Sequence, residues 1–253
     1  LKEHFIKGDF SIEGFQNPVV SSNLSGNLSL DKIAFFINSP ETKLLGSTAF
    51  DVQLKAQKID ENYRVKYLNG DVSVSGGSAS FTTKQLDVDF DELYVTLSNP
   101  DLKIKGHRFK HQTDLFDFNI NVNNWIDVFF NKSQLIKVDG KMNFDLLSTS
   151  VWTDFFNKFD ETEDTTSSVG IQIDKLKLDI NTLHFDAASF HDVEVQHLEF
   201  KEKIKLHDIR AKGQGGDYHL DIIEINNKND GYFIHTNGEI HQISVDKLLF
   251  EFD

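Results

Sequence analysis

The sequence contains no cysteine and only three prolines, and it has neither a long apolar run nor an excess of basic residues. Without cysteine the chain forms no disulfide and offers no thiolate to a metal, and its redox compartment stays undecided. No run reaches the roughly 18 apolar residues of a membrane-spanning helix. The 40 acidic residues against 26 basic ones give a net charge of -14, which disfavours nucleic-acid binding and docking on anionic lipid.

The chain also lacks a signal-like start: it begins at Leu1, and its single methionine is Met142. We therefore expect it to be part of a longer protein whose targeting or anchoring segment lies outside it. Phenylalanine, in contrast, is abundant, with 23 residues. Because phenylalanine buries a large apolar area and has no polar group, the fold must cover much apolar surface.

Strict alternation of apolar and polar residues is the dominant pattern of the chain. It is clearest in "QLDVDF", "LFDFNINVN" and "KLKLDI", whose apolar faces carry Leu86, Val88 and Phe90, then Phe116, Phe118 and Ile120, then Leu176, Leu178 and Ile180. Such alternation is typical of half-buried strands in antiparallel sheets. We expect about 15 such strands in an all-β chain with few short helices.

A short module recurs in which glycine is followed by polar and apolar residues in alternation. It occurs after Gly8, Gly26, Gly70 and Gly140, with a partial copy after Gly238. The irregular spacing argues against a solenoid of fixed period. The module predicts an elongated, twisted antiparallel meander in which glycine supplies the turn or bulge before each new strand.

Three segments have helical periodicity, near 124–132, at 148–159 and at 243–252. Their aromatic faces fit either end caps of the sheet or contacts with a membrane surface or partner. The acidic segment 161–168 is devoid of apolar residues and predicts a linker. It divides the chain into a β-rich section 1–160 and a second section 169–253, which can be parts of one sheet.

A one-sided apolar sheet must meet another apolar layer. Two sheets can cover each other as a β-sandwich, or one sheet can curl into an open trough that holds lipid chains. Periodicity alone favours the sandwich, because most soluble all-β domains cover themselves.

The glycine cluster in "AKGQGGDYHLDI" at first suggests a phosphate-binding loop. Such loops need a helix after the glycines, whereas the alternation that follows Gly216 predicts a strand. We therefore interpret Gly213, Gly215 and Gly216 as a bend between two strands.

Seven of the ten histidines lie between residues 184 and 241, and Asp87, Asp89 and Asp91 line one strand face. Neither group has the spacing of a metal site, so solvated strand faces are the better interpretation, with His207 and His219 on the wet face. No nucleophile motif occurs. The sequence therefore predicts no catalytic residue, no cofactor and no metal, although paired acids of a glycoside hydrolase are not excluded.

The stretch from Ile173 to Phe252 resembles the C-terminal region of AsmA-like proteins. The likeness rests on the start "I-x-x-L-x-L", the motif "L-x-D-I-x-A-x-G-x-G-G", then "NGEI" and the final "VDKLLFEF"; the first two contain Ile173, Leu176, Leu178, Leu206, Asp208, Ile209, Ala211, Gly213, Gly215 and Gly216. The earlier "VDGKMNFDLLSTSVW" fits the same scheme. This family is related to TamB and to the bridge-like lipid-transfer proteins.

The resemblance implies a periplasmic envelope-biogenesis protein of Gram-negative bacteria, tethered to the inner membrane by an anchor outside this chain. It favours an open apolar-lined groove over the sandwich. The implied partner is a phospholipid or another acyl-chain lipid, and nucleic acid is not implied. The candidate lipid-facing residues are Leu86, Val88, Phe90, Phe116, Phe118, Ile120, Leu176, Leu178 and Ile180. A self-covered sandwich acting as an adhesin or scaffold is the alternative, and a β-rich carbohydrate-active enzyme is a third hypothesis.

Overall fold

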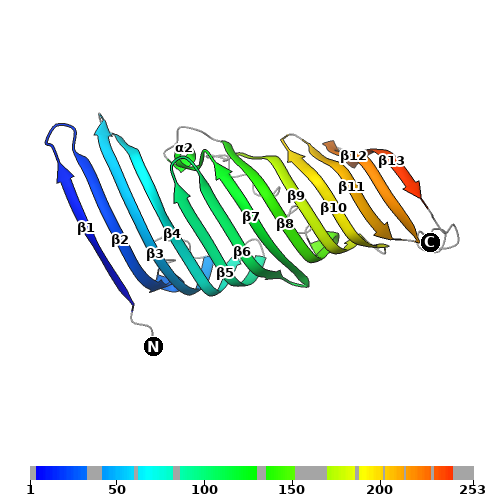
Figure 1. Cartoon of the computed structure of the whole chain (residues 1–253), viewed down its shortest axis with the longest axis horizontal. Helices are drawn as coiled ribbons and strands as arrows, with labels where there is room; N and C mark the ends of the chain where they lie inside the picture. Colours follow the sequence, from blue (N-terminus) through cyan, green and yellow to red (C-terminus); the bar gives the residue numbers. More distant parts are fainter. Residues whose placement is uncertain are drawn as a thin grey trace.

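The chain folds into one thirteen-stranded sheet whose strand order follows the sequence (Figure 1). The computed structural model describes residues 4–32, 42–59, 62–81, 86–129, 135–151, 170–185, 188–201, 203–213, 215–228 and 231–241. The strands are β1 (Phe5–Glu13), β2 (Val19–Ser29), β3 (Thr42–Ile59), β4 (Asn62–Phe81), β5 (Leu86–Ser98), β6 (Leu102–His111), β7 (Asp114–Asn123), β8 (Leu135–Ser148), β9 (Gly170–Phe185), β10 (Ala188–Phe200), β11 (Ile204–Gly213), β12 (Gly216–Lys228) and β13 (Gly231–His241).

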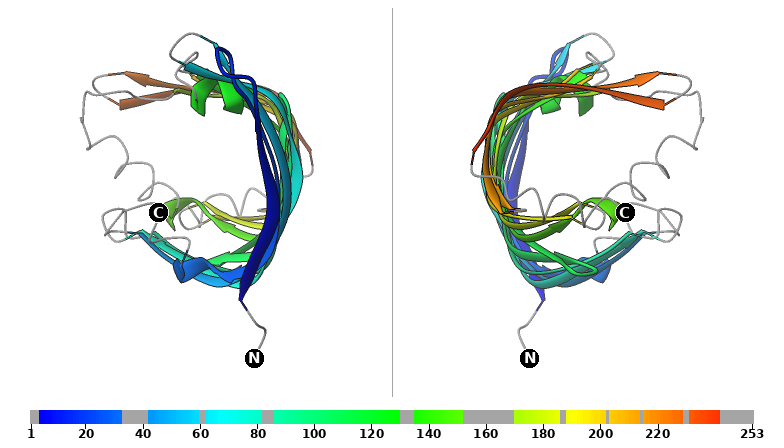
Figure 2. Two further views of the ribbon diagram at one scale, coloured as in Figure 1. Left: turned by 90° about the vertical axis from the view of Figure 1, so that its left-hand side faces the viewer. Right: turned by 90° about the vertical axis from the view of Figure 1, so that its right-hand side faces the viewer.

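The sheet is open, and it curves strongly along its strands (Figure 2). The edge strands β1 and β13 do not pair with each other in the described part of the chain, so the sheet does not close into a barrel. The predicted all-β elongated meander is confirmed. The predicted alternative of a β-sandwich is wrong, because all thirteen strands belong to the same hydrogen-bonded sheet rather than to two stacked ones.

One strand pair departs from the antiparallel pattern. β8 and β9 run parallel, with register from Leu135 opposite Gly170 to Ser148 opposite His184. Periodicity cannot reveal this, because alternation is the same in parallel and antiparallel strands. The pair joins the two sections that the sequence places at 1–160 and 169–253, so the sheet continues across them; the predicted linker 161–168 lies outside the described residues.

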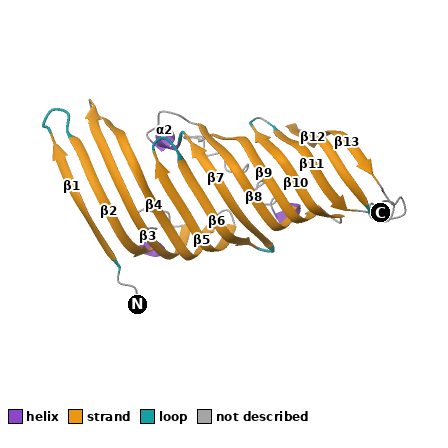
Figure 3. Cartoon of the chain, viewed as in Figure 1, coloured by secondary structure: helices purple, strands orange, loops and turns teal. Residues whose placement is uncertain are grey.

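Helices are few and short, as Figure 3 shows. Helix α2 (Trp125–Phe129) lies within the segment predicted near 124–132, and it buries Ile126 beside β8. Of the helix predicted at 148–159, residues 149–151 are described and helical, and the one predicted at 243–252 falls outside the described residues. No helix in the described ranges combines the length and apolarity needed to cross a membrane.

The recurring glycines do not precede strands, which corrects the sequence-based prediction. Gly8, Gly26, Gly70, Gly140 and Gly238 all lie inside strands. Gly140 shows the physical reason: its φ is 140°, and a Cβ there would lie 2.3 Å from the carbonyl oxygen of Asn119 on β7. These positions therefore need glycine for close backbone approach between strands, and not for a turn.

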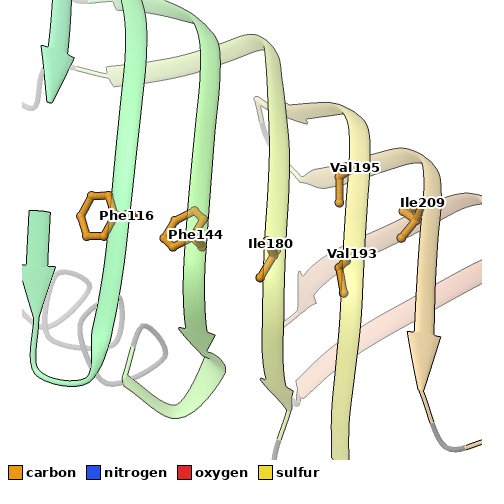
Figure 4. Packing of buried hydrophobic residues seen from close by; sticks show 6 residues of the cluster. All are labelled: Phe116, Phe144, Ile180, Val193, Val195 and Ile209. Carbon is orange, nitrogen blue, oxygen red and sulfur yellow. The ribbon is translucent and has the colours of Figure 1, made fainter. Parts of the chain in front are cut away.

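The centre of the hydrophobic core lies on one face of the sheet, from β7 to β11 (Figure 4). Its six buried members are Phe116, Phe144, Ile180, Val193, Val195 and Ile209. We call the face of the sheet that carries this cluster the apolar face, and the opposite one the polar face.

Candidate functional site

Cross-strand registration aligns apolar side chains into rows on the apolar face. In one row Phe116 is opposite Phe144, Phe144 is opposite Ile180, and Ile180 is opposite Val193. The next row runs through Phe118, Met142, Leu178 and Val195 in the same way. Because directly opposite residues project to the same side of a sheet, these rows form one continuous apolar surface.

Aromatic contacts extend this surface to β5. The rings of Phe90 and Phe109 stack at 4.7 Å, and Phe109 meets Phe118 edge-on at 4.8 Å. The register shifts between Gly106 and Phe109, where Arg108 adopts a left-handed φ of 52°. In a regular strand, Phe109 and Gly106 would face opposite sides of the sheet, because they are three residues apart. The bulge brings the ring of Phe109 to the apolar face.

Two phenylalanine rings lie over glycines of the neighbouring strand. A Cβ built on Gly77 would lie 2.1 Å from Cζ of Phe90, and one on Gly106 would lie 2.3 Å from Cε1 of Phe118. A glycine in a strand leaves its backbone exposed because it has no side chain, and a ring that lies over the glycine shields this backbone from water. The high phenylalanine content is thus used partly to cover glycines.

The structure brings the candidate residues with described side chains on β5, β7 and β9 to this one face. Phe90, Phe116, Leu176 and Ile180 are buried, with 4–7% of each residue exposed. The half-buried candidates are Val88, Phe118, Ile120 and Leu178. Leu86 is opposite Phe81 in the register, and its side chain lies outside the described ones. Any ligand on this face therefore meets the half-buried residues first.

Several members of the apolar face are absent from the sequence-based candidates. Phe144, Val193, Val195 and Ile209 are as buried as the candidates themselves. The alternation in "KMNFDL" and "VEV" is the signal that places the first three on an apolar face. Phe109 has no such signal, because the bulge at Arg108 breaks the alternation before it.

The polar face carries a ladder of ion pairs across β8, β9 and β10. Lys141 and Asp179 are 2.5 Å apart, Lys177 and Asp179 are 3.3 Å apart, and Lys177 and Glu194 are 2.6 Å apart. These charged residues alternate along the strands with the apolar rows, so the two faces of the sheet differ sharply in polarity.

The ladder shifts the pKa values of its members. The hydrogen bond to Glu194 raises the pKa of Lys177, and the same bond lowers the pKa of Glu194. Burial alone would raise the pKa of Asp179, but its hydrogen bonds from Lys141 and Lys177 outweigh burial and bring that pKa below its ordinary value. All three residues are therefore stabilised in their charged forms.

Some of the histidines and one member of the aspartate series have charged or aromatic neighbours. Nε2 of His219 is 3.0 Å from Oδ1 of Asp208, and the rings of His197 and His207 are 5.3 Å apart. Asp91 pairs with Arg108 at 3.5 Å. Among the described residues, no group of three or more histidines and carboxylates could hold a metal ion.

The glycine cluster forms a bend, as predicted. Gly213 ends β11 and is directly opposite Gly216, the first residue of β12. Gly215, between them, has a left-handed φ of 73°. The cluster therefore closes a tight hairpin, which is followed by a strand and not by an anion-binding helix.

Comparison with known proteins gives no relative. No profile of a known family matches the chain, and neither a curated protein nor a solved structure does. The resemblance to AsmA-like proteins stays a prediction.

Proposed function

We propose that the apolar face is the inner wall of an open groove that binds lipid acyl chains. In this proposal the chain belongs to a periplasmic envelope-biogenesis protein, tethered to the inner membrane, that guides lipids between the two membranes. The observation that supports it most directly is the alignment of apolar rows on one face of an open sheet. An adhesin or scaffold module without lipid cargo is the alternative function, although its sandwich form differs from the single sheet of this chain.

The half-buried residues are the ones that would contact lipid. Phe118, Ile120 and Leu178 keep part of their apolar surface accessible, whereas Phe116 and Ile180, on the same face, are buried. Burying an acyl chain is worth about 0.8 kcal/mol per methylene group. This attraction is non-directional, so the groove would accept acyl chains of different lipids without selecting a head group.

Native mass spectrometry with lipid extraction of the purified chain tests lipid binding. We expect copurifying phospholipid on the wild type and its loss in Phe118→Asp and Leu178→Asp, because a carboxylate on the apolar face repels an acyl chain. Asn119→Asp is the matched control: it places the same charge one residue from Phe118 but on the polar face, opposite Lys105 and Lys141.

Three outcomes would contradict the proposal. The first is a wild-type chain that neither carries lipid nor takes up a fluorescent fatty acid. The second is an Asn119→Asp control that loses lipid as completely as Phe118→Asp, with all variants folded by circular dichroism. The third is a fractionation of cells that natively express the protein in which the protein is found outside the envelope. The proposed location rests on the resemblance alone.

A further inference from the structure

Strand β1 lies at the edge of the described sheet, and its apolar side chains are exposed. In the described sheet it pairs only with β2, and all nine of its residues are exposed (Figure 1). Ile6, Phe10 and Ile12 are 60–66% exposed. Ile6 is opposite Gly26, and Gly26 is opposite Phe50, so these side chains continue the apolar surface to the border of the sheet.

Most of the usual devices that block edge pairing are absent from β1, although it carries three charged residues. Natural edge strands avoid association by being short, bulged, proline-containing or rich in lysine. β1 has nine residues, an unshifted register with β2, no proline and one lysine, Lys7. Its outer backbone groups therefore form a ready template for another strand.

The charges on β1 are self-complementary in an antiparallel pairing centred on Phe10. That register places Lys7 opposite the partner's Glu13 and Asp9 opposite the partner's Ser11. By the twofold symmetry the Lys7–Glu13 pair occurs twice. Within the described residues neither Lys7 nor Glu13 forms an ion pair, and Lys7 lies 5.3 Å from the ring centroid of Phe5. Both charges are therefore available to a second copy.

We propose that two copies of this chain associate through antiparallel β1–β1 pairing centred on Phe10. The twofold axis is perpendicular to the sheet, so the apolar faces of both copies lie on the same side. The sheets then join into one, with twice the number of strands. The inference rests on β1 alone and is independent of lipid binding.

Two neighbouring registers are the competitors. A pairing centred on Asp9 places that aspartate against itself, which like charges disfavour. A pairing centred on Gly8 places Lys7 opposite the partner's Asp9, and it leaves Glu13 without a basic residue opposite. A charge swap between Lys7 and Glu13 therefore distinguishes the Phe10 register from the Gly8 register.

Sedimentation velocity of the whole chain across the micromolar concentration range tests the pairing. The wild type is expected to dimerise. Lys7→Glu and Glu13→Lys each place two like-charge pairs across the interface and should raise the dimer Kd about tenfold. The double variant restores both opposite-charge pairs, so its Kd should return to within about threefold of the wild-type value. A monomeric wild type, unaffected single variants, or a double variant as weak as the singles would each overturn the proposal.

Cysteine cross-linking gives an independent readout, because the natural chain has no cysteine. Phe10→Cys places two thiols opposite each other across the twofold axis, within the Cα separation that a disulfide spans. Asn23→Cys on β2, an exposed position opposite Asp9 in the β1–β2 register, is the matched control. Phe10→Cys should form a disulfide-linked dimer on oxidation, whereas Asn23→Cys should not. Equal cross-linking of the two variants contradicts β1–β1 pairing.

Discussion

The ring of Phe90 occupies the place where a side chain of Gly77 would be. Gly77 on β4 and Phe90 on β5 are directly opposite each other, and a Cβ at Gly77 would lie 2.1 Å from Cζ of Phe90. Phe90 also stacks on Phe109, so the glycine determines where an aromatic series on the apolar face begins.

Gly77→Ala should therefore destabilise the fold by about 1–3 kcal/mol, because the added methyl group displaces the ring of Phe90. In a Phe90→Ala background the same substitution should cost much less. Urea denaturation of the four proteins in this double-mutant cycle measures the coupling. Gly76→Ala is the control: its Cβ meets nothing within 4 Å, so its cost comes from a left-handed φ of 57° and should not depend on Phe90. Additive effects of Gly77→Ala and Phe90→Ala would contradict the prediction.

Asp179→Asn should lower the free energy of unfolding at pH 7 by less than about 1 kcal/mol, because the ion pairs it removes are partly exposed and screened by water. The folded-state pKa of Asp179 is lowered, so its contribution is present above the unfolded pKa and is lost as pH falls through the folded pKa. The difference between wild type and variant should thus shrink below about pH 4. Urea denaturation between pH 3 and 7, a range that spans roughly this ionisation, tests the sign; a difference that grows on acidification is the contrary result.

Asp114→Asn should destabilise the fold by about 1–3 kcal/mol, since it replaces a buried acceptor with a donor. Asp114 is fully buried, and its two carboxylate oxygens accept hydrogen bonds from the backbone N–H of Ser148 at 3.2 and 3.1 Å. This contact ties the end of β8 to the start of β7. Asp89→Asn, at an exposed position of β5, is the control and should change stability by less than about 0.5 kcal/mol. Equal unfolding free energies for wild type and Asp114→Asn, measured by urea denaturation, would refute the role of this carboxylate.

The one-sided character of the sheet could be predicted from the sequence because alternation is a local property. Phe116, Phe118 and Ile120 needed only their own strand to be assigned to one face. Their partners could not be predicted, because register depends on which strands meet. The rows through Met142 and Val195 therefore emerge only from the fold. The same limit applies to the parallel pairing of β8 with β9.

Bulges and glycines account for the other differences. Phe109 faces the apolar side only because Arg108 takes a left-handed conformation, which no propensity of arginine predicts. The sequence predicts Gly140 before a strand, since glycine commonly marks turns. Glycine is required at this position by the backbone of the neighbouring strand β7, and not by the residues next to it in the sequence.

The agreement between strand order and chain order has a consequence for how such a molecule can change in size. Within the described sheet, each strand is hydrogen-bonded only to the strands that precede and follow it in the chain. A hairpin inserted between two antiparallel neighbouring strands would leave the pairing of all other strands unchanged, as a repeat added to a linear array does. The length of the molecule is therefore adjustable in steps of one hairpin, without redesign of its cross-section.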